Sequence, residues 1–177
     1  MRWAIITGEY PPQTGGVSDY TRLLARRLAD MGDEVHVWAP ECSLPPLSDP
    51  GVEVHRLPGC FGLKAIATLH RTLEGLRPYQ LLVQYGPHMY GFKAMNFLLC
   101  AWLFLRRKDA FWAMFHEVAF PISRANPLRH NFLGLMQRLM GRIVVASADQ
   151  SFASIPNYQA MLQSMARRRR VVVPRLN

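Results

Sequence analysis

Short apolar runs alternate with longer amphipathic stretches along most of the chain. The apolar runs, which predict β-strands, cover residues 3–7, 34–39, 52–57, 80–85, 110–115, 142–147 and 170–173. The amphipathic stretches, which predict helices, cover residues 18–31, 62–76, 91–107, 127–140 and 155–168, and Gly32 and Gly141 are placed as helix stops. This alternation predicts a doubly wound, mostly parallel, Rossmann-like α/β sheet of about seven strands in a single domain over residues 1–177.

The first predicted helix has an apolar side. Leu23, Leu24, Ala25 and Leu28 recur along it, and we expect them to form one buried stripe. The loop between the first strand and this helix contains two prolines and then two adjacent glycines.

The segment from Gly15 to Asp19 has the layout of an anion-binding site. Either Ser18 or Asp19 is suited to cap the helix. First-turn N–H groups and the positive end of the helix dipole would then face whatever lies against Gly15 and Gly16, and a phosphate fits such a place. A tight turn without a ligand explains the two glycines equally well.

Ligands of a doubly wound sheet bind beyond the carboxyl ends of its strands. The segments that follow the predicted strands are therefore the places to search, namely residues 8–16, 39–41, 86–90, 116–120 and 147–151. His116 and Glu117 follow one strand directly. His116 is a candidate to contact a substrate hydroxyl or phosphate, and the alternative is that it ties down its own loop. His88 lies in another of these segments, where a solvent-facing histidine is the commoner outcome.

Two motif classes are not matched. The metalloprotease pattern H-E-x-x-H fails because position 120 is Phe, and the other histidines show no ligand spacing, so we expect no metal site. The pattern G-x-G-x-x-G is also absent, which disfavours a nicotinamide site. Glu41, just past the second strand, is placed where such a site would bind a ribose hydroxyl, so a nicotinamide-dependent oxidoreductase domain stays an alternative.

The composition adds a strong positive charge to this picture. With 177 residues, 50% of them hydrophobic, the chain can bury a sizeable core. Its formal net charge of +9 and isoelectric point of about 10.1 should attract phosphorylated molecules, nucleic acid or an anionic lipid leaflet. No nucleic-acid motif accompanies the charge, which disfavours nucleic acid. The runs at 106–108 and 167–170 fit both solvated helix ends and a membrane-facing patch.

The cysteines and the apolar runs bear on the cellular setting. Cys42, Cys60 and Cys100 show no C-x-x-C spacing, which argues against a disulfide framework and favours a reducing cytoplasm. The longest apolar run, residues 97–105, is shorter than the roughly 20 residues that span a bilayer. We therefore expect a cytoplasmic protein, with peripheral contact to the inner face of the membrane as an option.

Several segments together resemble the N-terminal, acceptor-side domain of a family-four retaining glycosyltransferase with the GT-B fold. They are Gly8-Glu9-Tyr10-Pro11-Pro12 followed by Gly15-Gly16-Val17, then a Leu-rich helix, and then residues 31–37. Less specific are His116 after the fifth strand and residues 142–147, which resemble a later strand of such domains. The likeness runs over nearly the whole chain.

The resemblance implies an enzyme that transfers a sugar from a nucleotide-sugar to a saccharide or lipid-linked acceptor. It implies that Gly15 and Gly16 approach the donor diphosphate and that His116 contacts the donor sugar as the catalytic candidate. The acceptor-side candidates are Tyr10, Gln13, Asp19 and Glu117. No metal or other cofactor is implied beyond the nucleotide-sugar co-substrate, since helix dipoles and basic side chains meet the leaving-group charge.

The resemblance also implies a second domain that holds most of the donor. Its E-x7-E element and basic pair have no counterpart in these 177 residues. We therefore expect a C-terminal domain in the same or a partner chain, and no transfer by these residues alone. A non-catalytic basic module that binds membrane or nucleic acid is the remaining alternative.

Overall fold

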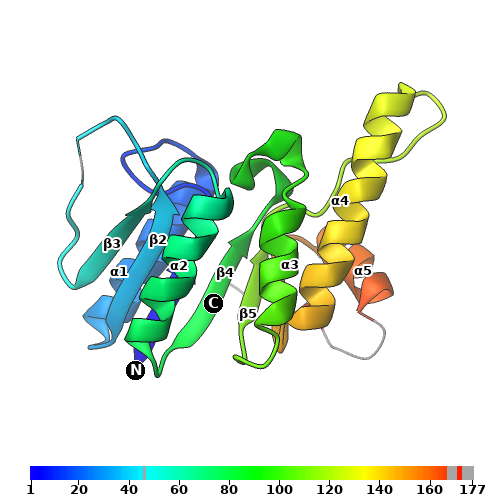
Figure 1. Cartoon of the computed structure of the whole chain (residues 1–177). Helices are drawn as coiled ribbons and strands as arrows, with labels where there is room; N and C mark the ends of the chain where they lie inside the picture. Colours follow the sequence, from blue (N-terminus) through cyan, green and yellow to red (C-terminus); the bar gives the residue numbers. More distant parts are fainter. Residues whose placement is uncertain (46, 167–170, 173–177) are drawn as a thin grey trace. The chain divides into compact units, whose positions relative to one another are not determined.

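A computed structural model of the chain describes residues 1–45, 47–166 and 171–172 (Figure 1). These residues fall into two compact units, Met1–Gln84 and Tyr85–Asn177. Each unit is built from parallel strands joined through helices, which confirms the predicted α/β class.

The first unit contains four parallel strands and two helices. Along the chain they are β1 (Arg2–Ile6), α1 (Gly16–Asp30), β2 (Glu34–Pro40), β3 (Val52–Leu57), α2 (Leu63–Leu76) and β4 (Gln80–Tyr85), the last residue of which belongs to the second unit. The strands lie in the order β3-β2-β1-β4, and Ile5 of β1 is opposite Val37 of β2 and Leu82 of β4.

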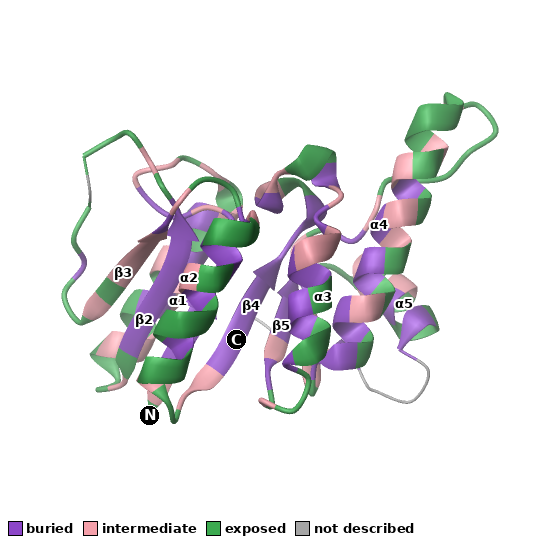
Figure 2. Cartoon of the chain, in the orientation of Figure 1, coloured by how far each residue is buried: buried purple, intermediate pink, exposed green. Residues whose placement is uncertain are grey.

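The core of this unit lies on both faces of its central strands. Ala4, Ile5 and Ile6 of β1 are fully buried, and so is Val37 of β2. Figure 2 shows β2 and most of β4 as buried, and α1 and α2 cover opposite faces of the strands. Near-continuous burial of this kind is typical of parallel strands covered on both sides.

Helix α1 differs from the predicted stripe. Its buried residues are Ser18, Thr21 and Ala25, whereas Leu23 is 61% exposed. Successive residues of a helix lie about 100° apart, so Leu23 cannot share one narrow face with Leu24 and Ala25. Gly32 follows the helix end with a φ of +86°, as its predicted role as a stop requires.

The second unit contains three further strands. Along the chain the unit holds the short 3₁₀ helices η1 (Pro87–Tyr90) and η2 (Phe92–Ala94), then α3 (Phe97–Leu105), β5 (Trp112–Phe115), α4 (Leu128–Ser147), β6 (Gln150–Ala153), α5 (Pro156–Met165) and β7 (Val171–Val172). Strand β6 pairs in parallel with β5 and with β7. The predicted basic run 167–170 and residue 173 lie outside the described residues.

The strand predicted at residues 142–147 is wrong, because these residues form the last turns of α4. Met140, Val144 and Val145 are buried on this helix, and a short apolar run fits a buried helix as well as a strand. Gly141 is not a helix stop but lies inside α4, where an added Cβ would contact Val118. The strand here is β6, so residues 147–151 lie at its amino end and not among the segments after a strand.

The helix predicted over residues 91–107 begins only at Phe97. The side chain of Asn96 caps it by accepting a hydrogen bond from the Leu99 backbone N–H at 2.9 Å. Just before it, Phe92, Lys93 and Ala94 all have φ between 53° and 64°. A right-handed helix cannot run through such residues, so η2 stays separate from α3.

Candidate functional site

The N-terminus of α1 is capped from a distance by Glu9. The backbone N–H groups of Val17 and Ser18 both donate to Oε1 of Glu9 at 3.1 Å. The Thr7 hydroxyl donates to the backbone carbonyl of Glu9 at 2.8 Å and so helps to fix this loop. A carboxylate here satisfies donors that the helix itself leaves unpaired and is favoured by the helix dipole.

The prediction that Ser18 or Asp19 caps α1 is therefore wrong. The helix begins at Gly16, two residues earlier than expected, so Ser18 lies within its first turn. The buried Ser18 hydroxyl donates to the Gln13 carbonyl at 2.6 Å, while Asp19 is exposed.

The two glycines of this loop have different surroundings. A Cβ added at Gly15 would lie 2.5 Å from Oε1 of Glu9 and would displace this carboxylate from its observed position. A Cβ added at Gly16 would meet nothing within 4 Å. An external group can therefore approach the backbone at Gly16, whereas the space beside Gly15 is filled by the chain's own carboxylate.

Tyr10 and Gln13 hold the loop together. The Tyr10 side chain is fully buried and its hydroxyl donates to Asp49 at 3.5 Å. Burial and the neighbouring Asp49 raise the pKa of Tyr10 to about 12. Gln13 Oε1 accepts from the Tyr10 backbone N–H at 3.3 Å. These contacts favour a role in the shape of the loop for Tyr10.

The carboxylate of Asp49 is buried in the first unit. It is 5% exposed and accepts from Nε and Nη2 of Arg22 at 2.9 and 2.8 Å. Through Asp49, the segment before β3 is joined to α1 and to Tyr10 of the first loop. Glu41, on the same long connection, accepts from the Gly59 N–H at 3.3 Å.

His116 follows β5 directly, as predicted. Its backbone N–H donates to the Tyr85 carbonyl at 2.8 Å, and its carbonyl accepts from the Ser154 hydroxyl at 3.2 Å. Burial lowers the pKa of His116 to about 4, so the imidazole is neutral at pH 7. A neutral imidazole has one donor and one acceptor nitrogen and can hydrogen-bond a sugar hydroxyl in either sense.

A pocket of about 150 Å³ lies next to this segment of the second unit. The pocket brings together two segments that were predicted to follow strands, residues 86–90 and 116–120. Nε2 of His88 lies 3.9 Å from Oε2 of Glu117, and the His88 ring packs edge-on against Phe120. The lining residues are Pro87, His88, Glu117, Ala119, Phe120, Pro121, Gln137 and Tyr158.

Gln137 and Tyr158 were not expected in this pocket. Gln137 is fully buried, and its Oε1 accepts from the Phe120 N–H at 2.9 Å. Its Nε2 has no hydrogen-bond partner among the described residues. Gln137 is followed directly by Arg138, so no clear signal in the sequence indicates that the glutamine is buried.

The family model described as Glycosyltransferase Family 4 matches residues 14–175. The chain belongs to this family. A search of curated protein sequences found no match. Among solved structures, the family 4 chain is similar to sucrose-phosphate synthase from Thermosynechococcus elongatus, with 15% identity and a TM-score of 0.67.

The structural match covers 98% of this chain but 47% of the synthase chain. At this identity the match shows the fold alone, which is that of one half of a GT-B glycosyltransferase. The resemblance to the N-terminal domain of such an enzyme is thus confirmed at the level of family and fold. Within the described residues, no helix of the family 4 chain has the length and apolar character needed to cross a membrane.

The site candidates of the family 4 chain are distributed over both units. Gly15, Gly16, Tyr10, Gln13 and Asp19 belong to the first unit, and His116 and Glu117 to the second.

Burial of His116 predicts a pH-dependent contribution to stability. Its pKa falls from 6.5 to about 4 on folding, so the unfolded chain binds the proton more readily. Stability should therefore fall as the pH drops from 6.5 to 4, by about 3 kcal/mol for this group. His116→Gln lacks the titrating group, so its free energy of unfolding in urea should fall less over the same range. Equal pH slopes for the two proteins would contradict this.

Proposed function

We propose that the chain is the acceptor-side half of a retaining glycosyltransferase of the hexosyltransferase type. The enzyme would move a sugar from a nucleotide-sugar to a saccharide or lipid-linked acceptor in polysaccharide or glycolipid biosynthesis. Membership of family 4 supports the transferase class. Because the chain spans 47% of the synthase structure, we expect the donor-binding half in a longer chain or a partner chain.

The observation that carries the acceptor role is the chemistry of the pocket around Glu117. A saccharide needs donors and acceptors in close alternation together with an apolar face to pack on. Glu117 accepts, Nε2 of Gln137 donates, and the Phe120 ring is apolar. A buried donor without a partner costs about 1–3 kcal/mol, which a sugar hydroxyl would offset.

The donor role rests on the first loop and on His116. We place the donor diphosphate against the backbone at Gly16, where an added Cβ would meet nothing. The neutral imidazole of His116 would hydrogen-bond the donor sugar. The reaction would be a same-face displacement assisted by the departing phosphate, without a catalytic metal.

Glu117→Ala tests the acceptor site in the enzyme together with its donor half. A panel of hexose nucleotides and saccharide acceptors first identifies a working pair. The variant should raise the KM for the acceptor at least fivefold and leave the KM for the donor unchanged, because the carboxylate lines the proposed acceptor pocket. Glu41→Ala, which removes another exposed carboxylate, is the control. Absence of transfer with every hexose nucleotide, or an unchanged acceptor KM, would contradict the proposal.

Gly16→Val tests the donor phosphate site in the same assay. The added side chain has space in the fold, so thermal unfolding should stay close to that of the wild type. Transfer should fall at least tenfold, because the side chain occupies the approach to the backbone. Gly75→Val in α2 is a matched control, since a Cβ there also meets nothing. A Gly16→Val enzyme of normal activity would overturn the assignment.

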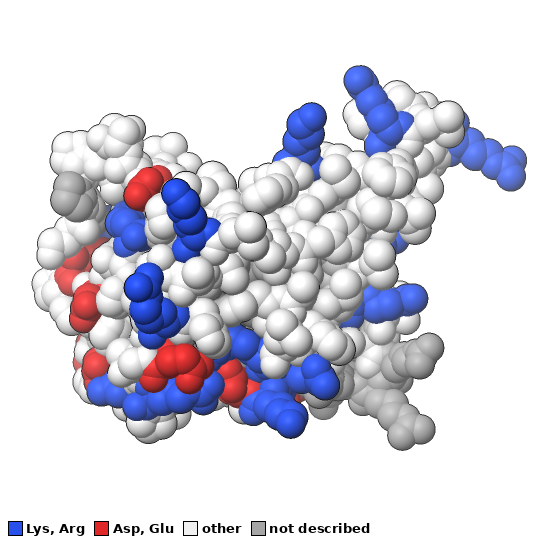
Figure 3. Space-filling model, in the orientation of Figure 1, with Lys and Arg blue, Asp and Glu red and all other residues white. Residues whose placement is uncertain are grey.

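One exposed face of α4 supports a lipid-linked acceptor. Leu128, Phe132, Leu135 and Leu139 are 45–87% exposed at i, i+4, i+7 and i+11, so they form one apolar stripe. Residues 118–148 contain Arg124, Arg129, Arg138 and Arg142 but no acidic residue. Figure 3 shows basic side chains over α4 and the loop before it. An apolar stripe with flanking arginines suits an anionic bilayer surface, and we propose this as the occupant.

Vesicle sedimentation tests this surface on the chain itself. The wild type should bind phosphatidylglycerol-containing vesicles and lose most of this binding at high salt, because part of the attraction is electrostatic. Phe132→Ser with Leu135→Ser should weaken binding at least tenfold. Leu63→Ser, which removes a leucine 76% exposed on α2, is the control and should bind like the wild type. Lack of wild-type binding, or equal loss in the control, would argue that a protein surface covers α4.

A further inference from the structure

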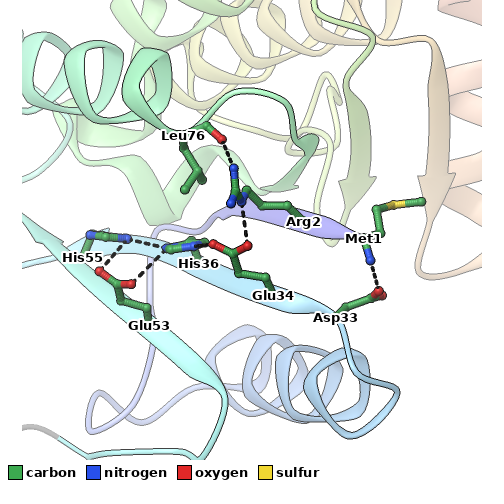
Figure 4. A network of polar contacts seen from close by, with 8 residues as sticks. All are labelled: Met1, Arg2, Asp33, Glu34, His36, Glu53, His55 and Leu76. Atoms are coloured by element: carbon green, nitrogen blue, oxygen red, sulfur yellow. Dashed lines mark hydrogen bonds and ion pairs between the residues drawn. The ribbon is translucent and has the colours of Figure 1, made fainter.

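Three side chains on β2 and β3 bring ligand atoms to one point. In the parallel register His36 is opposite Glu53, and His55 lies two residues further along β3, so all three share one face. Nδ1 of His36 lies 3.0 Å from Nε2 of His55. Oε2 of Glu53 lies 3.4 Å from Nδ1 of His36, and Oε1 of Glu53 lies 3.6 Å from Nε2 of His55 (Figure 4).

These separations match the requirements of a small divalent ion. Zinc binds histidine nitrogen and carboxylate oxygen at about 2.0–2.1 Å in tetrahedral geometry, which places neighbouring ligand atoms about 3.3 Å apart. The observed separations of 3.0, 3.4 and 3.6 Å lie around this value, the last two measured to different oxygens of the Glu53 carboxylate. A hydrogen bond between the two imidazoles explains the shortest separation, but it does not require the carboxylate to approach both of them.

The outer contacts of His36 are those of a metal ligand. Its Nε2 lies 2.9 Å from Oε1 of Glu34, which can only accept, so in the neutral ring Nε2 carries the proton and the electron pair of Nδ1 is directed at the cluster. Oε2 of Glu34 is in turn held by Nε of Arg2 at 2.8 Å, and Nη1 of Arg2 donates to the Leu76 carbonyl. Figure 4 shows this chain of contacts running from α2 through Arg2 and Glu34 to His36.

His55 is also held in place. Its ring stacks on Trp38 with 4.4 Å between ring centroids, and Nε1 of Trp38 donates to the Thr72 hydroxyl of α2 at 2.9 Å. Glu53 is 65% exposed at its side chain, and a depression of about 370 Å³ opens beside Glu34, His36 and Glu53. Two oriented imidazoles and one accessible carboxylate thus leave a path from solvent.

We propose that Nδ1 of His36, Nε2 of His55 and the Glu53 carboxylate bind one zinc-class divalent cation, with a fourth position open to solvent. Mixed imidazole and carboxylate ligands suit zinc and its neighbours and not magnesium or calcium. The cluster lies in the amino-terminal half of β2, whereas ligands of parallel sheets bind at the carboxyl ends of the strands. The ion therefore has a structural or regulatory role, in which it joins β3 to β2, and takes no part in sugar transfer.

Zinc titration of the chelator-treated chain tests the site. Calorimetry should give one Zn²⁺ ion per chain, and the ion should raise the temperature of thermal unfolding because it binds only the folded register. His55→Gln and Glu53→Gln should each weaken zinc binding at least tenfold. Both side chains are partly exposed, so these variants should fold without the ion, which circular dichroism checks. His130→Gln, which removes an exposed imidazole on α4, is the matched control and should bind like the wild type.

Two further measurements separate this site from a surface ion. Co²⁺ should quench Trp38 fluorescence saturably, and the quenching should disappear in Trp38→Phe. Glu34→Gln should weaken zinc binding about tenfold with unchanged stoichiometry, since Glu34 only orients His36. Absence of saturable zinc binding, or wild-type affinity in His55→Gln, would overturn the proposal. Neither result depends on transferase activity.

Discussion

The carboxylate of Glu9 at the N-terminus of α1 determines the shape of the first loop. Helix N–H groups without partners are costly, and the N-cap residue Gly15 has no side chain to supply one. Glu9 therefore reaches across the loop to Val17 and Ser18, and a side chain at position 15 would displace its carboxylate. A phosphate at this helix meets a charge of the same sign already in place. This is why the open backbone at Gly16, and not the space beside Gly15, is available to an anionic ligand.

The side chains of Asp49 and Arg56 also hold this loop through polar contacts. Tyr10 is joined to the buried Asp49, and Arg56 of β3 donates to the carbonyls of Pro11 and Pro40. A loop that binds a ligand through its backbone gains from being held before the ligand arrives, because less conformational entropy is lost on binding. The contacts of Tyr10 thus explain its burial better than acceptor binding does.

The sequence pattern was sufficient for the fold class, for β1 to β5 and for the position of His116 after β5. It failed at residues 142–147, because Ile143, Val144 and Val145 favour a strand locally while packing keeps them in α4. It also could not show the cap of α1, since Glu9 lies outside the helix that it caps. His36, Glu53 and His55 show no metal-ligand spacing along the chain, because only the register of β2 and β3 brings them together. Contacts between elements, and not local preference, decided each of these cases.

Strand β3 carries residues of two groups of polar contacts in the first unit: the cluster of His36, Glu53 and His55, and the contacts that Arg56 makes with backbone carbonyls. His55 contributes to the cluster with His36, and the next residue, Arg56, reaches the carbonyls of Pro11 and Pro40. Neighbouring residues of a strand point to opposite faces, so the two groups do not compete for space. A cation that joins β3 to β2 would also limit the movement of Arg56 and hence of the loop before α1. The backbone of β3 thus joins the cluster directly to the residue whose side chain holds this loop.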